Sequence, residues 1–105
     1  MEFIVIYCTV PNKNEGKEIA RALVESGFAA CVNIIDKVES IFSWDGKLTE
    51  EKEAMLVIKT RKDLFIQVNR VIQKLHSYTV PEVIALPVIE ADEMYLKWIA
   101  HETNE

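Results

Sequence analysis

The sequence predicts an α+β fold of the ferredoxin-like type, with a βαββαβ antiparallel sheet and a C-terminal helix. Three observations support this prediction. Runs rich in β-branched and aromatic residues alternate with two stretches of helical periodicity, in the order strand, helix, strand, strand, helix, strand. Asp45-Gly46, a pair typical of tight hairpin turns, separates the two central strands. Both crossovers are helical, so we expect both helices on one face of the sheet.

The first strand and the first helix are predicted near the N-terminus. Residues 3–9 form an almost unbroken apolar run, as in a central strand covered on both faces, and Pro11 ends it. Asn12 and Glu15 have the spacing of a capping box, which indicates that a helix begins there. Gly27 is expected to end this helix in the left-handed conformation.

A long hairpin is predicted next. Its first strand, residues 31–44, has alternating apolar residues that are interrupted at Asp36 and Ser40. Its second strand, residues 47–60, begins polar and ends apolar. A strand of about 13 residues spans roughly 43 Å, whereas a helix of about 15 residues spans only about 22 Å. The helices therefore cannot cover the whole hairpin.

The uncovered end of the hairpin predicts an interface. It carries Phe42 and Trp44 beside the turn at Gly46. Exposed apolar patches usually mark interaction surfaces, and unpaired strand edges invite partner strands. We therefore expect a homo-oligomer with Phe42, Trp44 and Gly46 at the contact.

The remaining elements follow the hairpin. Thr60 is predicted to cap a second helix, with Asp63 three residues further on. Pro81 follows that helix, and residues 83–89 are predicted to form the fourth strand. Asp92 begins a short terminal helix.

The bulk properties restrict the class of protein. A chain of 105 residues is expected to form a single domain, residues 1–105. The net charge of −5 disfavours nucleic-acid binding. No apolar run is long enough for a membrane span, and the acidic N-terminus lacks the features of a signal peptide. We therefore expect a cytoplasmic protein whose cysteines are thiols.

No enzyme motif is visible. The chain has no Gly-rich phosphate loop, no GxSxG and no HExxH, and no acid/base pair or nucleophile triad stands out. We expect no catalysis. The soft-metal candidates are Cys8, Cys31 and His76, none of which has metal-site spacing. The alternatives are small buried hydrophobic residues for the cysteines and a helix-terminal residue for His76. Whether Cys8 and His76 reach the same end of the sheet stays open.

Charged and aromatic residues offer a second kind of site. Lys59 and Glu82 are each flanked by apolar sequence, so they either form a paired charge at a subunit boundary or point to solvent. Trp44, Tyr78 and Trp98 either line a pocket or serve as interface anchors.

Over nearly its whole length, the chain resembles the CutA family of divalent-cation tolerance proteins. The matching residues are Cys-Thr before a proline (Cys8, Thr9, Pro11), Ala-Ala-Cys-x-Asn (29–33), the Trp-x-Gly-Lys hairpin tip (44–47), the strand end (58–60), His-x-Tyr-x-x-Pro-Glu (76–82) and Tyr-Leu-x-Trp (95–98). The chain departs from the family's pattern at three positions: Leu75 replaces the first histidine of a pair, Ser77 replaces a proline, and Phe42 stands where tyrosine is common.

The resemblance implies a ferredoxin-like homotrimer, built like the PII-type signalling proteins, that binds divalent cations. It implies copper as a candidate metal, with Cys8 and His76 as ligands, and no metal is expected to be needed for folding. By analogy with PII, a cleft between subunits would hold a small ligand, with Cys31, Lys59, Tyr78, Glu82 and Trp98 as candidate contacts. The alternative function is therefore a small-ligand sensor or signalling trimer with an unknown ligand or protein partner, in which metal binding is incidental. A purely structural trimer is the third alternative.

Overall fold

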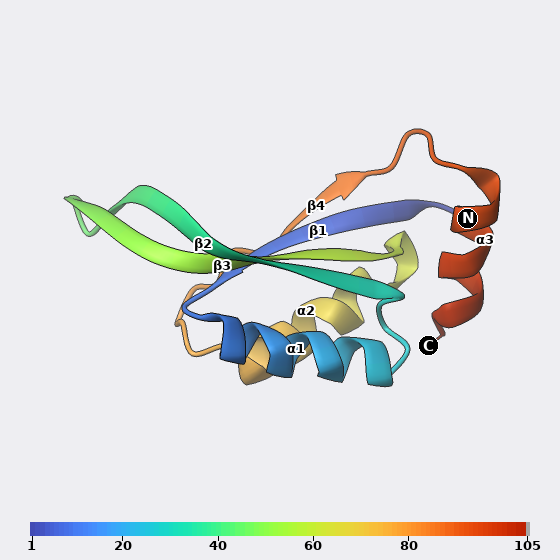
Figure 1. The fold of residues 1–105 in the computed structure, drawn as a ribbon, viewed down its shortest axis with the longest axis horizontal. Helices are drawn as coiled ribbons and strands as arrows, with labels where there is room; N and C mark the ends of the chain where they lie inside the picture. Colours follow the sequence, from blue (N-terminus) through green and yellow to red (C-terminus); the bar gives the residue numbers. More distant parts are fainter. Residues whose placement is uncertain (105) are drawn as a thin grey trace.

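Four antiparallel strands form one sheet in the order β2-β3-β1-β4, as the computed structural model shows for residues 1–104 (Figure 1). The elements are β1 (Phe3–Val10), α1 (Lys13–Glu25), β2 (Cys31–Trp44), β3 (Lys47–Arg61), a 3-10 turn (Lys62–Leu64), α2 (Phe65–Leu75), β4 (Ile84–Pro87) and α3 (Glu93–Glu102). The predicted α+β class, element order and antiparallel sheet are confirmed.

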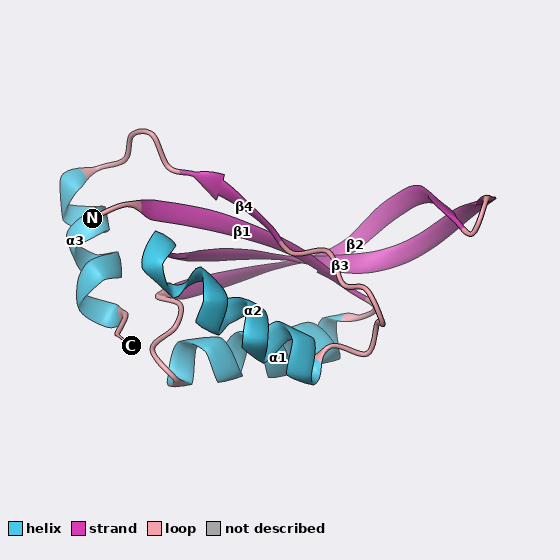
Figure 2. Ribbon diagram, turned by 180° about the vertical axis from the view of Figure 1, so that it is seen from behind, coloured by secondary structure: helices cyan, strands magenta, loops and turns pink. Residues whose placement is uncertain are grey.

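Helices α1 and α2 cover one face of the sheet, as predicted (Figure 2). Every second residue of β1, from Ile4 to Val10, is buried. The central residues of β3 alternate in the same way, so one face of both strands meets the helices. The core packed between the layers consists of Ile4, Ile6, Cys8, Val10, Ile19, Leu23, Ala29, Ala54, Leu56, Ile58, Val68 and Ile72. Burying each of the larger aliphatic side chains stabilises the fold by about 1.5–3 kcal/mol.

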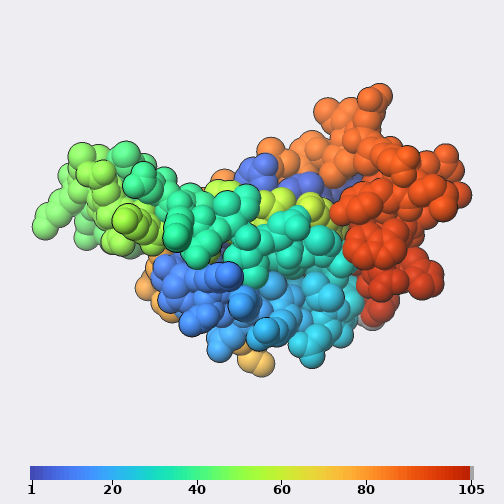
Figure 3. All heavy atoms as spheres, viewed as in Figure 1, coloured from blue at the N-terminus to red at the C-terminus, as the bar shows by residue number. Residues whose placement is uncertain are grey.

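The β2–β3 hairpin extends far beyond the helices and makes the molecule elongated, 44 × 25 × 22 Å (Figures 1 and 3). The predicted uncovered end of the hairpin, here called the arm (residues 40–51), is confirmed, since Trp44 and Leu48 are 56% and 78% exposed. The predicted interruption at Asp36 is a β-bulge between Ile35 and Val38. At Ser40 the apolar alternation is interrupted without a break in pairing, because Ser40 pairs regularly with Glu51.

Thr60 does not cap the second helix. Strand β3 continues through Thr60, whose hydroxyl donates a 2.6 Å hydrogen bond to the Phe28 carbonyl in the buried core. The 3-10 turn then precedes α2, and Asp63 forms an ion pair with Arg61 at 3.2 Å. The apolar surroundings on β3 favour the strand over the cap, an effect of tertiary packing on local preference.

Strand β4 is shorter than predicted and covers Ile84–Pro87. It pairs only with residues 4–7 of β1, and one further hydrogen bond joins the Val88 N–H to the Phe3 carbonyl. Beyond that bond the chain leaves the sheet, and Ile89 is almost fully exposed.

The predicted helix boundaries at Asn12, Gly27 and Asp92 are confirmed. The Asn12 side chain accepts the Glu15 N–H, and the Asp92 side chain accepts the Tyr95 N–H. Gly27 follows α1 with φ of 77°. Its carbonyl accepts a 2.8 Å hydrogen bond from the Asn104 N–H, which ties the segment after α3 to the end of α1.

Replacing Gly27 with alanine should destabilise the fold more than the same change at Gly46. Both glycines have φ near 75°, where an L-residue costs about 1–2 kcal/mol. A methyl group at Gly27 would also lie 2.8–3.0 Å from the Asn104 side chain, whereas nothing lies within 4 Å at Gly46. Chemical denaturation of both variants at one protein concentration measures the difference. Equal losses of unfolding free energy in the two variants would show that the Asn104 side chain moves away from the added methyl group without destabilising the fold.

Candidate functional site

His76 continues the hydrogen bonding of the sheet where β4 is absent. The Phe3 carbonyl faces β4, and alternate carbonyls along a strand face the same edge. The β1–β4 ladder ends at Tyr7 and Ile84, and the next carbonyl on that edge belongs to Thr9. It accepts a 2.7 Å hydrogen bond from His76 Nε2, and the histidine side chain is fully buried. His76 and the β1 residues Cys8 and Thr9 therefore lie at the same end of the sheet.

Both ring nitrogens of His76 are occupied. A carbonyl can only accept, so Nε2 carries the proton, and Nδ1 accepts the Tyr78 N–H at 3.0 Å. Glu15 Oε2 lies 3.5 Å from Nδ1 and accepts hydrogen bonds of 3.0 Å from both the backbone N–H and the hydroxyl of Ser77. The first turn of α1 thereby holds the segment that follows α2.

Tyr78 joins this segment to the hairpin. Its hydroxyl donates a 2.7 Å hydrogen bond to Glu53 Oε2, and its ring lies 4.7 Å from the His76 ring. Burial, and then the hydrogen bond to the Glu53 carboxylate, raise the pKa of Tyr78, so it stays a donor at neutral pH. Glu53 is only 6% exposed. Within residues 1–104, no cationic side chain pairs with it.

Cys8 lies under α1 and α2, on the covered face of the sheet, and is fully buried. Burial raises the pKa of its thiol to about 12, with further contributions from the charges of Glu82, Glu15 and Glu53. The thiol is therefore protonated at neutral pH, and metal ligation requires loss of that proton. Because the folded state holds the proton more tightly, this contribution to stability is complete below about pH 9 and is lost as pH rises towards 12.

A groove of about 860 Å³ lies between the segment 77–82 and the arm. Its aromatic and acidic lining consists of Phe42, Trp44, Tyr78, Glu51, Glu53 and Glu82. The structure thus brings two of the predicted interface residues, Phe42 and Trp44, together with two of the predicted pocket residues, Tyr78 and Glu82.

The other predicted pocket residues lie at the opposite end of the sheet. Lys59 is paired in register with Cys31 on β2 and with Val5 on β1, and its ammonium group contacts the Asn33 side chain. Helix α3, which carries Trp98, packs against β3 there. The four residues from Val5 to Thr9 separate this end from the groove by about 13 Å. One copy of the chain does not bring Lys59 to Tyr78 and Glu82.

The sequence did not assign Glu15, Glu53 or Ser77 to the site. Glu15 matched a capping box, but its carboxylate bonds Ser77 instead. Glu53 lies in a polar stretch of β3 that predicts exposure, and only the tertiary structure buries it.

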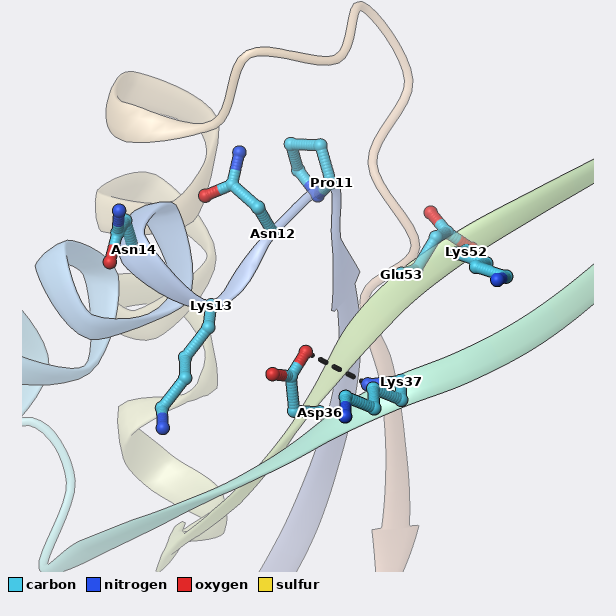
Figure 4. Close-up of a pocket in the computed structure, with 8 residues that line it drawn as sticks. All are labelled: Pro11, Asn12, Lys13, Asn14, Asp36, Lys37, Lys52 and Glu53. Carbon is cyan, nitrogen blue, oxygen red and sulfur yellow. Dashed lines mark hydrogen bonds between the residues drawn. The ribbon is translucent and has the colours of Figure 1, made fainter.

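A smaller hollow of about 360 Å³ lies beside the N-terminus of α1 (Figure 4). It mixes Lys13, Lys37 and Lys52 with Asp36 and Glu53, and the Asp36 side chain accepts the Lys37 N–H of the bulge. Mixed charges define no single class of ligand. Within the described residues, no three His, Cys, Asp or Glu side chains gather closely enough to hold a metal ion.

The fold places the chain in the class of ferredoxin-like α+β proteins with an extended β2–β3 hairpin. The solved structure of CutA1 from Oryza sativa has a TM-score of 0.97 and 42% sequence identity, covering 100% of this chain and 96% of that one. The profile of the CutA1 divalent ion tolerance protein family matches residues 4–102. The chain belongs to this family.

Two relatives illustrate the range of the family. The "Divalent-cation tolerance protein CutA" of Thermus thermophilus is 41% identical over 100 residues, covering 95% of this chain and 97% of the relative. "Protein CutA, chloroplastic" of Arabidopsis thaliana is 43% identical over 96% of this chain, which spans only 56% of that relative. Among residues 1–104, no helix is long and apolar enough to cross a membrane.

Thiol labelling of the native protein should modify Cys31 and leave Cys8 intact. Cys31 is partly exposed, whereas Cys8 is fully buried with a raised pKa. Alkylation at neutral pH, followed by mass spectrometry of the peptides, measures the two sites. A denatured sample, in which both cysteines react, is the control. Rapid modification of native Cys8 would contradict the packing described for β1.

Proposed function

We propose that the chain forms a homotrimer that binds divalent cations, copper among them, and takes part in the response to metal ions. One observation carries this proposal. Glu15, Glu53 and Glu82 lie near enough to Cys8 for their charges to raise its pKa. Among residues 1–104 no lysine or arginine forms an ion pair with these carboxylates, and a concentration of negative charge around one end of a sheet attracts cations.

Cys8 and His76 are the proposed copper contacts, because thiolate and imidazole are ligands that copper favours. Binding there has two requirements. Cys8 must lose its proton, and His76 Nδ1 must release the Tyr78 N–H. Further donors would come from water or from a neighbouring copy, because two ligands alone make an incomplete site.

Exposed apolar surface supports the proposed assembly. The face of the sheet opposite α1 and α2 carries exposed Tyr7, Ile35, Ile84 and Leu86, and it continues into the arm. Soluble monomers rarely leave a contiguous surface of this kind uncovered. The trimeric number comes from the family resemblance.

The remaining features of the proposal rest on composition and motifs. We propose that residues 1–105 act as a single domain, without catalysis, in the cytoplasm. The name of the Arabidopsis relative places that protein in the chloroplast, so compartment varies among relatives.

The second candidate function is a small-ligand sensor of the PII-like type. The observation that favours it is the groove beside Tyr78 and Glu82, whose volume of about 860 Å³ lies in the range of small-molecule sites. A metabolite that binds this groove would protect the protein against thermal unfolding, whereas a screen without any shift would count against the sensor.

Copper titration by calorimetry tests the proposed metal contacts. The wild type should bind copper stoichiometrically, and the double variant Cys8→Ser with His76→Ala should lose at least about tenfold in affinity, which corresponds to 1.4 kcal/mol. His101→Ala is the matched control, because His101 is the other histidine and its side chain is 84% exposed. Unchanged copper affinity in the double variant would place the site elsewhere.

Trp44→Ala should weaken assembly more than substitution of an exposed helix residue. Trp44 is a large apolar side chain near the arm tip, whereas Arg21 on α1 is exposed away from the sheet. Light scattering over a range of protein concentrations measures the mass of Trp44→Ala and of Arg21→Ala. A monomeric wild type, or a Trp44→Ala protein that assembles like the wild type, would overturn the role of the arm.

A further inference from the structure

We infer that Lys59 of one copy completes the acidic groove of the next copy by pairing with Glu53 and Glu82. The inference rests on the proposed assembly and adds to it the residues that meet at each boundary. Two sets of charges support this pairing, because neither has an ionic partner among residues 1–104 of one copy.

Glu53 is the first of these charges. Its side chain lines the groove, and the residue is only 6% exposed. Oε2 accepts one hydrogen bond from Tyr78, and no cationic side chain among residues 1–104 lies within ion-pair distance. Glu82 lines the same groove and is likewise without an ionic partner there. Charged groups are almost never buried unless they are paired, so the buried Glu53 carboxylate favours a cationic partner from another copy.

Lys59 is the complementary charge. It is partly buried on β3, between the apolar Ile58 and the buried Thr60. Its ammonium group contacts the neutral side chain of Asn33, and no carboxylate within the described chain pairs with it. The four-carbon stem can lie along apolar surface while the charge reaches beyond it.

Both charges lie on the open face of the same strand. Glu53 and Lys59 are six residues apart on β3, and residues separated by an even number point to the same face. That spacing corresponds to about 20 Å, which a single lysine side chain cannot cross. Met55 and Val57 lie between them. The open face is thus an apolar strip with an acidic end and a basic end.

A cyclic assembly brings opposite ends together. In a ring of three, every contact is head-to-tail, so each copy uses one patch towards one neighbour and a different patch towards the other. When the apolar strips pack head-to-tail, the basic end of one copy lies against the acidic end of the next. Every boundary then buries the strip and places one positive charge against the carboxylates of the groove, whereas contact between like ends would bring like charges together.

Charge reversal tests this pairing. Lys59→Glu and Glu82→Lys should each raise the protein concentration at half-assembly by about tenfold or more, because each leaves buried charges unpaired. The double reversal should restore assembly to within about threefold of the wild type, as expected for directly coupled residues. Sedimentation velocity over a dilution series measures the assembled fraction. Lys62→Glu is the control, because Lys62 pairs with Glu2 on the exposed surface.

Neutral variants provide a second measurement if a reversed charge prevents folding. Lys59→Met and Glu82→Gln, alone and together, form a double-mutant cycle. The fold-loss of assembly affinity in the double variant should be smaller than the product of the two single losses.

The outcomes separate the two proposals. A monomeric wild type overturns the proposed assembly. An assembled wild type whose single variants assemble equally well, or whose paired changes show no coupling, overturns the pairing and leaves the assembly standing.

Discussion

The structure depends on a mismatch of length between its two layers. Helix α1 has 13 residues and spans about 20 Å, whereas the 15 residues of the twisted strand β3 have a contour length of about 46 Å. The helices bury one face of the central sheet and leave the distal hairpin bare. A monomer would expose the arm and the open face to water. The uncovered surface that follows from this mismatch is therefore the reason to expect assembly in this fold.

The end of β1 next to the arm is held by polar contacts in place of a strand. Strand β4 is too short to reach Thr9, and the buried His76 ring supplies the missing hydrogen bond. Glu15 and Glu53 then anchor the adjoining segment through Ser77 and Tyr78. These contacts place carboxylates around a cysteine and beside a groove. The same arrangement that stabilises the sheet end also creates the negative charge on which the proposed cation binding depends.

Much of the fold could be predicted from local patterns, and the errors had tertiary causes. The caps at Asn12 and Asp92 and the hairpin turn at Asp45-Gly46 depend on neighbouring residues, and all three are confirmed. Threonine is a common helix-capping residue, but the hydroxyl of Thr60 donates its hydrogen bond to the Phe28 carbonyl instead. The candidate site was predicted less completely, because Glu53 reads as a solvent-exposed residue until Tyr78, 25 positions away, covers it. Contacts at such separations leave no periodic signal in the chain.

The sequence by itself determined the order of elements, the length of the hairpin, the family resemblance and the residue types available for chemistry, because propensity, capping and periodicity act over a few neighbouring positions. Only the tertiary structure decided which of these residues meet. It placed Tyr78 and Glu82 beside Phe42 and Trp44, and it put Lys59 at the far end of the sheet with Cys31. The physical reason is strand register. Pairing β1 with β3 and β4 determines where each side chain lies along the sheet, and register is set by the packing of the whole core.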